Sequence, residues 1–349
     1  MDAAHTVLDL RGDFPRRVTE LTPAPPAPAA VVLELRPPPE APPARPPERF
    51  PSRAAGFSIR RGEPLIETLR RVSGEQFDAA LTGLEEDAGD EGIHLVRTSL
   101  KRVRAVLRLA VGTIGEKKRR AESRLLATAS RQLSTAREAA VISNTLDKVR
   151  SDYQHLLVPS AFAAVLTRLQ ARYRSEMDSL GSGRASVTEI LHDCRTRYST
   201  WEAPQGGFGL LAPGLSEVYR LGRQLGRTAT AGGAPGDFHQ WRKRVKDLRY
   251  AMELLQPVWP GMVGEIREQL DGLGDLLGEH HDLWLLEEEL GRRPDLCPDP
   301  AERTLLLALG RLRMSQLEQK SLRSGMLLYA EPVRSFVNRL GSYWRVWHR

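Results

Sequence analysis

The chain has 349 residues, 41% of them hydrophobic and 27% charged, which is the balance of an ordinary folded domain. No apolar run approaches the roughly 18 residues that span a bilayer, so an integral membrane protein is excluded, and the N-terminus lacks the apolar segment of a secretory signal. Two cysteines, Cys194 and Cys297, are too few for a disulfide framework, and we expect a reducing, cytoplasmic setting.

The net charge is positive: 51 lysines and arginines against 44 aspartates and glutamates give +7 at pH 7 and a pI near 9.6. Only seven of the basic residues are lysines. Arginine binds phosphate oxygens with two parallel hydrogen bonds, so an anionic partner is one interpretation. Biased codon usage would give the same composition. Only the distribution of the basic residues along the chain can distinguish these two interpretations.

Residues 1–61 differ in composition from the rest of the chain. Twelve of the 24 prolines lie between Pro23 and Pro51. Proline-rich sequence favours extended, solvated backbone, and the one strand-like run, residues 31–35, is too short to form a sheet. We therefore predict a mostly disordered tail over 1–61; a peptide that binds a partner protein is the alternative.

From residue 62 onward the apolar residues recur at helical spacing. The clearest run consists of Leu95, Val96, Leu100, Val103 and Leu107. Clusters of glycine and proline, for example at 181–183 and 204–209, mark helix ends. Aromatic residues make up only 6%, which favours a core of leucine, alanine and valine. The pattern predicts an all-α fold of about ten helices.

Two segments of this helical region carry the same pattern of basic residues, 145 positions apart. Each has a histidine, an arginine three residues later, a lysine after seven and an arginine after ten. The sets are His94, Arg97, Lys101 and Arg104, and His239, Arg242, Lys246 and Arg249. Such a match is improbable by chance, so we predict one domain over 62–349 with two related halves, 62–200 and 210–349.

On a helix these residues form a cationic stripe. At about 100° per residue, five basic residues fall within about 80° of one another, beside the apolar face: His94, Arg97, Lys101, Arg104 and Arg108. No acidic residue lies between His94 and Arg108 to relieve their repulsion. The stripe therefore indicates an anionic partner. A solvated basic helix face is the alternative, and the second copy of the pattern makes that alternative weaker.

A linear polyanion fits such stripes better than a single phosphate does. The chain lacks glycine-rich phosphate loops, zinc-finger and RRM signatures, and the alternating aromatic residues of a single-strand-binding surface. Nucleic acid is the main competing partner, because its backbone also offers phosphates and its binding also weakens with salt. The sequence leaves open the width of the channel or groove, which decides whether stacked bases enter.

The two stripes resemble the paired signatures of the CHAD domain (conserved histidine α-helical domain). The segment 277–282, Leu-Gly-Glu-His-His-Asp, is similar to the family's segment after the second signature. Ala136–Val141 lies at the corresponding place after the first signature, with Glu138 where the family has aspartate. The segment 219–227 resembles the basic helix before the second signature. The resemblance covers 62–349, without the proline-rich tail.

The resemblance implies two four-helix-bundle-like repeats with pseudo-two-fold symmetry around a basic central channel. It implies non-catalytic binding of inorganic polyphosphate, in the cytoplasm or at polyphosphate granules, with no cofactor and with divalent cations only accompanying the polyanion. The triphosphatase activity of relatives fused to a CYTH domain is not implied, since the Glu-x-Glu-x-Lys pattern is missing. The polyphosphate-binding residues would be His94, Arg97, Lys101, Arg104, Arg108, Arg220, Arg223, Arg227, His239, Arg242, Lys243, Lys246, Arg249 and Tyr250.

The histidines allow further readings. We expect His94 and His239 to begin their helices and to contact phosphate near the helix N-terminus, with a pKa near 6.5 that makes this contact pH-sensitive. The run Glu279-His-His-Asp282 lacks the i, i+3 or i, i+4 histidine spacing of helical metal sites, so we expect no metal site built from protein alone. A metal-binding phosphohydrolase that uses Asp193, Glu279 and Asp282 is the less favoured alternative. We expect the protein to have no enzymatic activity.

Two further arginines, Arg102 and Arg244, fall outside the stripes. We expect them either in solvent or in contact with the other half of the domain. Glu253 occupies the second-half position that corresponds to Arg108, so the two stripes differ in length.

Overall fold

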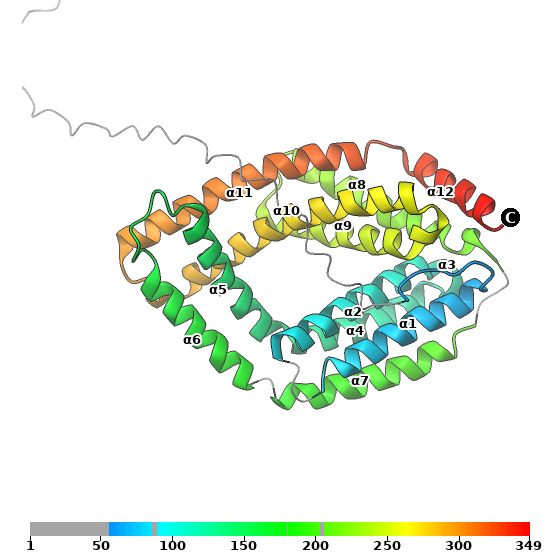
Figure 1. Cartoon of the computed structure of the whole chain (residues 1–349), viewed down its shortest axis with the longest axis horizontal. Coiled ribbons are helices and arrows are strands. Elements are labelled where there is room, and N and C mark those ends of the chain that lie inside the picture. The colour runs from blue at the N-terminus through cyan, green and yellow to red at the C-terminus, as the bar shows by residue number, and fades with distance from the viewer. Residues whose placement is uncertain (1–55, 86–88, 180, 203–205) are drawn as a thin grey trace, which may run out of the picture. The chain divides into compact units, whose positions relative to one another are not determined.

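The computed structural model describes residues 56–85, 89–179, 181–202 and 206–349. In these residues it contains twelve α-helices, three short 3-10 helices and no β-strand (Figure 1). The helices are α1 (Leu65–Thr82), α2 (Gly89–Leu109), α3 (Val111–Ile114), α4 (Glu116–Gln132), α5 (Ser134–Asp152), α6 (Ala163–Ser179), α7 (Gly181–Ser199), α8 (Ala212–Thr230), α9 (Pro235–Leu255), α10 (Pro260–Arg292), α11 (Pro300–Leu328) and α12 (Val333–Trp347). The all-α prediction is confirmed.

The described residues form twelve helices, whereas the sequence predicted about ten. One reason is that α4 and α5 are two separate helices. Leu133, between them, has a backbone (φ −105°, ψ 10°) that departs from the α-helix, whereas α10 continues unbroken for 33 residues. The four-residue helix α3 adds another. Among the described residues, no helix combines the length and the apolar character that crossing a membrane requires.

The folded domain begins earlier than the sequence predicted. Phe57 and Ile59, which the prediction placed in the tail, are 4% and 2% exposed. The Ile59 amide donates to the Leu254 carbonyl at 3.0 Å, and the Phe57 ring meets Tyr250 edge-on at 6.5 Å between ring centres. Two apolar residues in a short segment were too weak a signal against the neighbouring prolines. The tail prediction for 1–55 lies outside the described residues.

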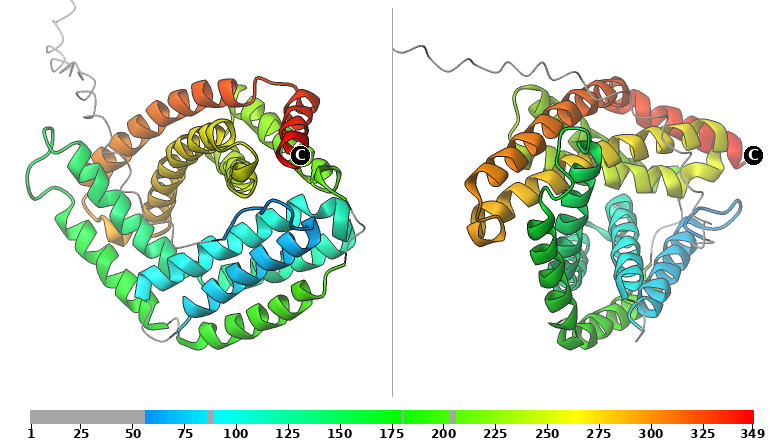
Figure 2. Two further views of the ribbon diagram at one scale, coloured as in Figure 1. Left: turned by 45° about the vertical axis from the view of Figure 1, so that its right-hand side comes forward. Right: turned by 60° about the vertical axis from the view of Figure 1, so that its left-hand side comes forward.

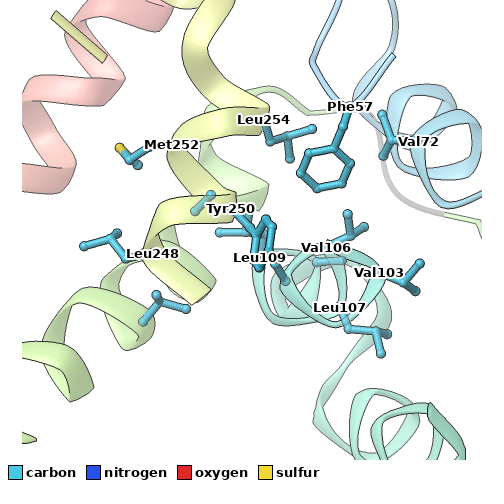
Figure 3. Close-up of a cluster of buried hydrophobic side chains, with 14 of the residues drawn as sticks. Phe57, Val72, Val103, Val106, Leu107, Leu109, Leu248, Tyr250, Met252 and Leu254 are labelled. Atoms are coloured by element: carbon cyan, nitrogen blue, oxygen red, sulfur yellow. The ribbon is translucent and has the colours of Figure 1, made fainter. Parts of the chain in front are cut away.

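Helices α1, α2, α8 and α9 share one hydrophobic core, because α2 packs against the other three. Figure 3 shows Val106 and Leu109 of α2 next to Tyr250 of α9, at the contact between these two helices. The predicted apolar run of α2 is at most 1% exposed from Val96 to Leu107. Leu95 is the exception at 38%, because it lies about 100° from Val96 around the helix and off this face. This core fixes the two stripe-bearing helices relative to each other.

The contact between α8 and α2 depends on a glycine. A Cβ on Gly214 would lie 2.2 Å from the Arg108 carbonyl oxygen and 2.6 Å from the Leu109 Cα, and backbone atoms cannot yield as a flexible side chain can. We expect Gly214→Ala to lower the free energy of unfolding by about 1–3 kcal/mol in urea titrations. Gly310→Ala, where a Cβ would meet nothing within 4 Å, should raise it by up to about 1 kcal/mol. Equal effects of the two substitutions would contradict this packing.

A second hydrophobic core joins α5 and α6 to α10 and α11. Ile142 and Leu146 of α5 and Leu283 and Leu286 of α10 are all at most 4% exposed in this cluster. Figures 1 and 2 show α5 and α6 beside the α10–α11 pair. Segments from both predicted halves therefore meet in this core, and the first cavity described below lies next to it.

Candidate functional site

A cavity of about 370 Å³ lies where α5, α9, α10 and α11 meet. Both predicted halves contribute to its wall. Its charged lining residues are Lys148 and Asp152 of α5, Arg242 and Lys246 of α9, Asp275, Glu279 and Asp282 of α10, and Arg313 of α11. The second stripe thus contributes Arg242 and Lys246 to the wall of this cavity.

Arg242 and Lys246 are the cavity's unusual cations. Neither has a hydrogen bond or a close ion pair with any residue that the structure describes, and Arg242 Nε is buried. The Arg242 guanidinium lies against Gly278, where a Cβ would come within 3.4 Å of Nη2. Burial lowers the pKa of Arg242, and burial together with the Arg242 charge lowers that of Lys246 to about 8. Desolvated cations of this kind favour an incoming anion.

The first stripe approaches helix α9 around Asp247. Arg108 of α2 lies 3.1 Å and Arg244 of α9 lies 2.9 Å from this carboxylate. Burial lowers the pKa of Arg104 and of Lys243, and nearby positive charges lower both further. This group, the Asp247 cluster, gathers four cations around one carboxylate: Arg104, Arg108, Lys243 and Arg244. Its excess positive charge is a second attraction for an anion.

His239 does not lie where the sequence analysis expected it. Helix α9 begins at Pro235 and α2 at Gly89, so His239 and His94 follow the first turn of their helices rather than beginning them. The His239 ring stacks on His281 of α10, with ring centres 3.8 Å apart. Burial lowers the pKa of His239 to about 4 and that of His281 to about 3, so both rings are neutral at pH 7. A His239 that titrates near pH 6.5 is therefore wrong for the unliganded protein.

This pair makes stability depend on pH. Between about pH 4 and pH 6.5 the unfolded chain binds protons at His239 and His281 that the folded chain does not. The free energy of unfolding should therefore fall as the pH drops from 6.5 towards 4. We expect thermal melts of His239→Gln/His281→Gln to lose less stability over this range than the wild type. Parallel pH profiles for the two proteins would show that the ring pair does not carry the effect.

Several predicted ligand contacts already have partners inside the protein. Arg249 Nε donates to Asp271 at 2.6 Å, and its Nη1 donates to Glu253 at 2.5 Å. Tyr250 is 7% exposed and packs against Phe57. The expectation that Arg249 and Tyr250 face the ligand is therefore not supported by their surroundings. Arg102, for which two positions were open, donates to Glu253 at 2.6 Å and so contacts the second half.

The remaining residues of the first stripe lie nearer the start of α2. His94 is exposed, and Arg97 Nη1 lies 3.5 Å from the Ser130 and Leu133 carbonyl oxygens. Lys101 is half-buried. None of these three lines the cavity that holds Arg242 and Lys246.

The basic residues of α8 face a different part of the surface. Arg220, Arg223 and Arg227 border a shallow hollow of about 500 Å³ together with Val333. Arg220 pairs with Glu217 at 2.8 Å, and Arg223 Nε donates to the Tyr329 carbonyl at 2.9 Å. None of these three arginines lines the cavity that holds Arg242 and Lys246.

Sequence reasoning missed Lys148 and Arg313, which line the same cavity as Arg242. They lie on α5 and α11, outside the repeated pattern, so no local signal marks them. The sequence analysis did name Glu279 and His281, as parts of the segment after the second stripe and of a possible metal site. Within the described ranges no group of three or more histidine, cysteine, aspartate or glutamate side chains is arranged to hold a metal ion.

Neither cysteine is arranged as a nucleophile. Burial raises the pKa of Cys194 to about 11, and burial also raises that of Cys297. Both thiols therefore stay protonated at pH 7, and both are buried. The cavity that holds Arg242 and Lys246 is lined by charged side chains, and neither cysteine contributes a thiol to it.

Two solved structures share this fold. The crystal structure of the CHAD domain from the plant Ricinus communis superimposes with a TM-score of 0.60 at 16% identity, covering 82% of this chain and 98% of that one. PptA from Streptomyces chartreusis superimposes with a TM-score of 0.55 at 18% identity, covering 77% of this chain and 100% of that one. No curated protein matches the chain in sequence.

The family itself is shown by the sequence. The profile of the CHAD domain matches residues 72–291, which is more than half of the chain and includes both stripes and the segment after the second stripe. The resemblance found from the repeated His-x-x-Arg pattern is confirmed, and the chain belongs to the CHAD domain family.

Proposed function

We propose that this protein binds inorganic polyphosphate without cleaving it. The observation that carries the proposal is the state of Arg242 and Lys246, two desolvated cations that form no close ion pair with a described residue and whose charge Asp275 and Asp282 offset only in part. Burying an unpaired charge is unfavourable, and the energy is recovered when an anion enters. The cavity of about 370 Å³ is large enough for several phosphate units.

A chain-like anion fits better than a single phosphate because the cations form two groups. Arg242 and Lys246 face the cavity, whereas Lys243 and Arg244 of the same helix belong to the Asp247 cluster. Consecutive helix residues point about 100° apart, so a ligand must extend around α9 to reach both groups. Polyphosphate carries about one negative charge per unit along a flexible chain, which matches this requirement.

The arrangement of helices supports the same proposal. We infer that α2 and α9 are equivalent, that α1 corresponds to α8, and that the α4–α5 pair corresponds to the single helix α10. Each half is then a four-helix-bundle-like repeat, and the basic channel lies between the two repeats. The repeats meet where α5 contacts α10 and where α2 contacts α8 and α9.

Ligand-induced stabilisation tests this proposal. A ligand that binds only the folded state at 100 times its Kd stabilises it by about 2.7 kcal/mol. We expect long-chain polyphosphate to raise the Tm, less so at higher salt, while poly-glutamate of the same total charge has a smaller effect. Gel electrophoresis should show an unchanged phosphate chain length after incubation. No stabilisation would contradict binding, and shortened chains would contradict the absence of cleavage.

A further inference from the structure

The cavity contains a second pair of cations that is already occupied by a carboxylate. Glu279 of α10 accepts a hydrogen bond from Lys148 Nζ of α5 through Oε2 and another from Arg313 Nε of α11 through Oε1, each at 2.5 Å. All three side chains line the cavity together with Arg242 and Lys246. We call this Lys148–Glu279–Arg313 arrangement the Glu279 bridge.

The Glu279 carboxylate resembles the ligand in form and charge. A carboxylate spreads one negative charge over two oxygens, and an internal phosphate of polyphosphate spreads one negative charge over two non-bridging oxygens. Each Glu279 oxygen accepts from one cation, as the two oxygens of such a phosphate could. Burial raises the pKa of Glu279, but the hydrogen bonds from Arg313 and Lys148 outweigh burial and lower it, so the carboxylate stays charged.

The bridge is not needed to hold the helices together. The second hydrophobic core already joins α5 to α10 and α11 through buried residues such as Leu146, Leu283 and Leu317. Lys148 is also half exposed, with 50% of its side chain accessible, so it can change partners at little cost to packing. These features suit a contact that can open.

We propose that Lys148 and Arg313 form a second phosphate-binding subsite and that Glu279 occupies this subsite until polyphosphate displaces it. This inference rests on the proposed function. A ligand that reaches all four cations must compete with Glu279, so the carboxylate weakens the binding of any polyanion. Glu279 is therefore an affinity-determining residue that contributes no attraction of its own to the ligand.

The test is the substitution Glu279→Gln, measured as the Kd for fluorescently labelled long-chain polyphosphate. We expect binding about tenfold tighter than wild type, with a steeper decrease of affinity with salt, since more phosphates are neutralised. Glu287→Gln is the matched control: it removes the same charge and another α10–α11 ion pair, Glu287–Arg311, but lies outside the cavity. The control should change the Kd less than twofold.

A double-mutant cycle separates a subsite from a general charge effect. Lys148→Gln/Arg313→Gln should bind polyphosphate more weakly than wild type, and adding Glu279→Gln to that background should leave its Kd unchanged. If Glu279→Gln binds no more tightly than wild type, or tightens both backgrounds equally, the inference is overturned. If wild type does not bind polyphosphate at all, the proposed function fails as well, which distinguishes the two failures. Thermal melts confirm that each variant is folded.

Discussion

Replacing Arg242 and Lys246 together by glutamine should weaken polyphosphate binding at least a hundredfold. Each side chain would supply charge-assisted hydrogen bonds worth about 1.5–3 kcal/mol, and each 1.4 kcal/mol corresponds to about a factor of ten in Kd. Neither cation forms a close ion pair with a described residue, and Asp275 and Asp282 of the same cavity offset their charge only in part, so burial still lowers both pKa values and an incoming phosphate is attracted. Equilibrium titration with labelled polyphosphate measures the effect.

The same variant should be at least as stable as wild type when no ligand is present. Glutamine removes two buried charges whose desolvation outweighs the attraction of Asp275 and Asp282, so the free energy of unfolding should stay equal or rise. Arg292→Gln/Arg311→Gln is the control, since it removes two positive charges from side chains that are 67% and 64% exposed. If the control weakens binding as much as the cavity variant does, net charge rather than the cavity governs affinity.

Replacing Glu253 by alanine should lower the free energy of unfolding by up to about 3 kcal/mol, because it removes one partner from a partly buried ion-pair network. Glu253 accepts from Arg102 of α2 at 2.6 Å and from Arg249 of α9 at 2.5 Å. These three side chains are between 14% and 20% exposed. Without the carboxylate, Arg102 loses its ion-pair partner, and both guanidinium groups keep their positive charge. Urea titration measures the loss.

An exposed ion pair provides the comparison for Glu253. Asp78 and Arg195 lie 2.6 Å apart, but their side chains are 55% and 51% exposed. Asp78→Ala should therefore cost no more than about 1 kcal/mol. A loss below 1 kcal/mol for Glu253→Ala would show that the Arg102–Glu253–Arg249 network does not join α2 to α9 in the way that the distances suggest.

The repeated pattern predicted the helices that matter, because amphipathic spacing and a duplicated motif are local properties of the sequence. It placed Arg242 and Lys246 on one face of α9, and the structure directs both into a cavity. It could not show that Asp271 and Glu253 neutralise Arg249, because that pairing depends on how α9 packs on α10. A helical projection identifies a face but not what covers it.

The cavity residues on α5 and α11 could not be predicted from the sequence either, because their position also depends on how the helices pack. Lys148 and Arg313 are separated by more than 160 positions and belong to no shared motif, yet Glu279 binds both. His281 was noted, but its stacking on His239 follows from the contact between α9 and α10. Neutral histidines in this position are a tertiary effect of burial, which the residue type alone does not reveal.

The most direct test of the account is a competition titration. Wild-type protein, bound to labelled long-chain polyphosphate at several salt concentrations, is titrated with unlabelled polyphosphate, duplex DNA, tRNA and ATP at matched total phosphate. Binding through desolvated cations that line a cavity predicts that only polyphosphate displaces the label efficiently and that the affinity falls steeply with salt. Equal displacement by DNA or tRNA would contradict it and would show that the basic residues form an open surface for nucleic-acid backbones.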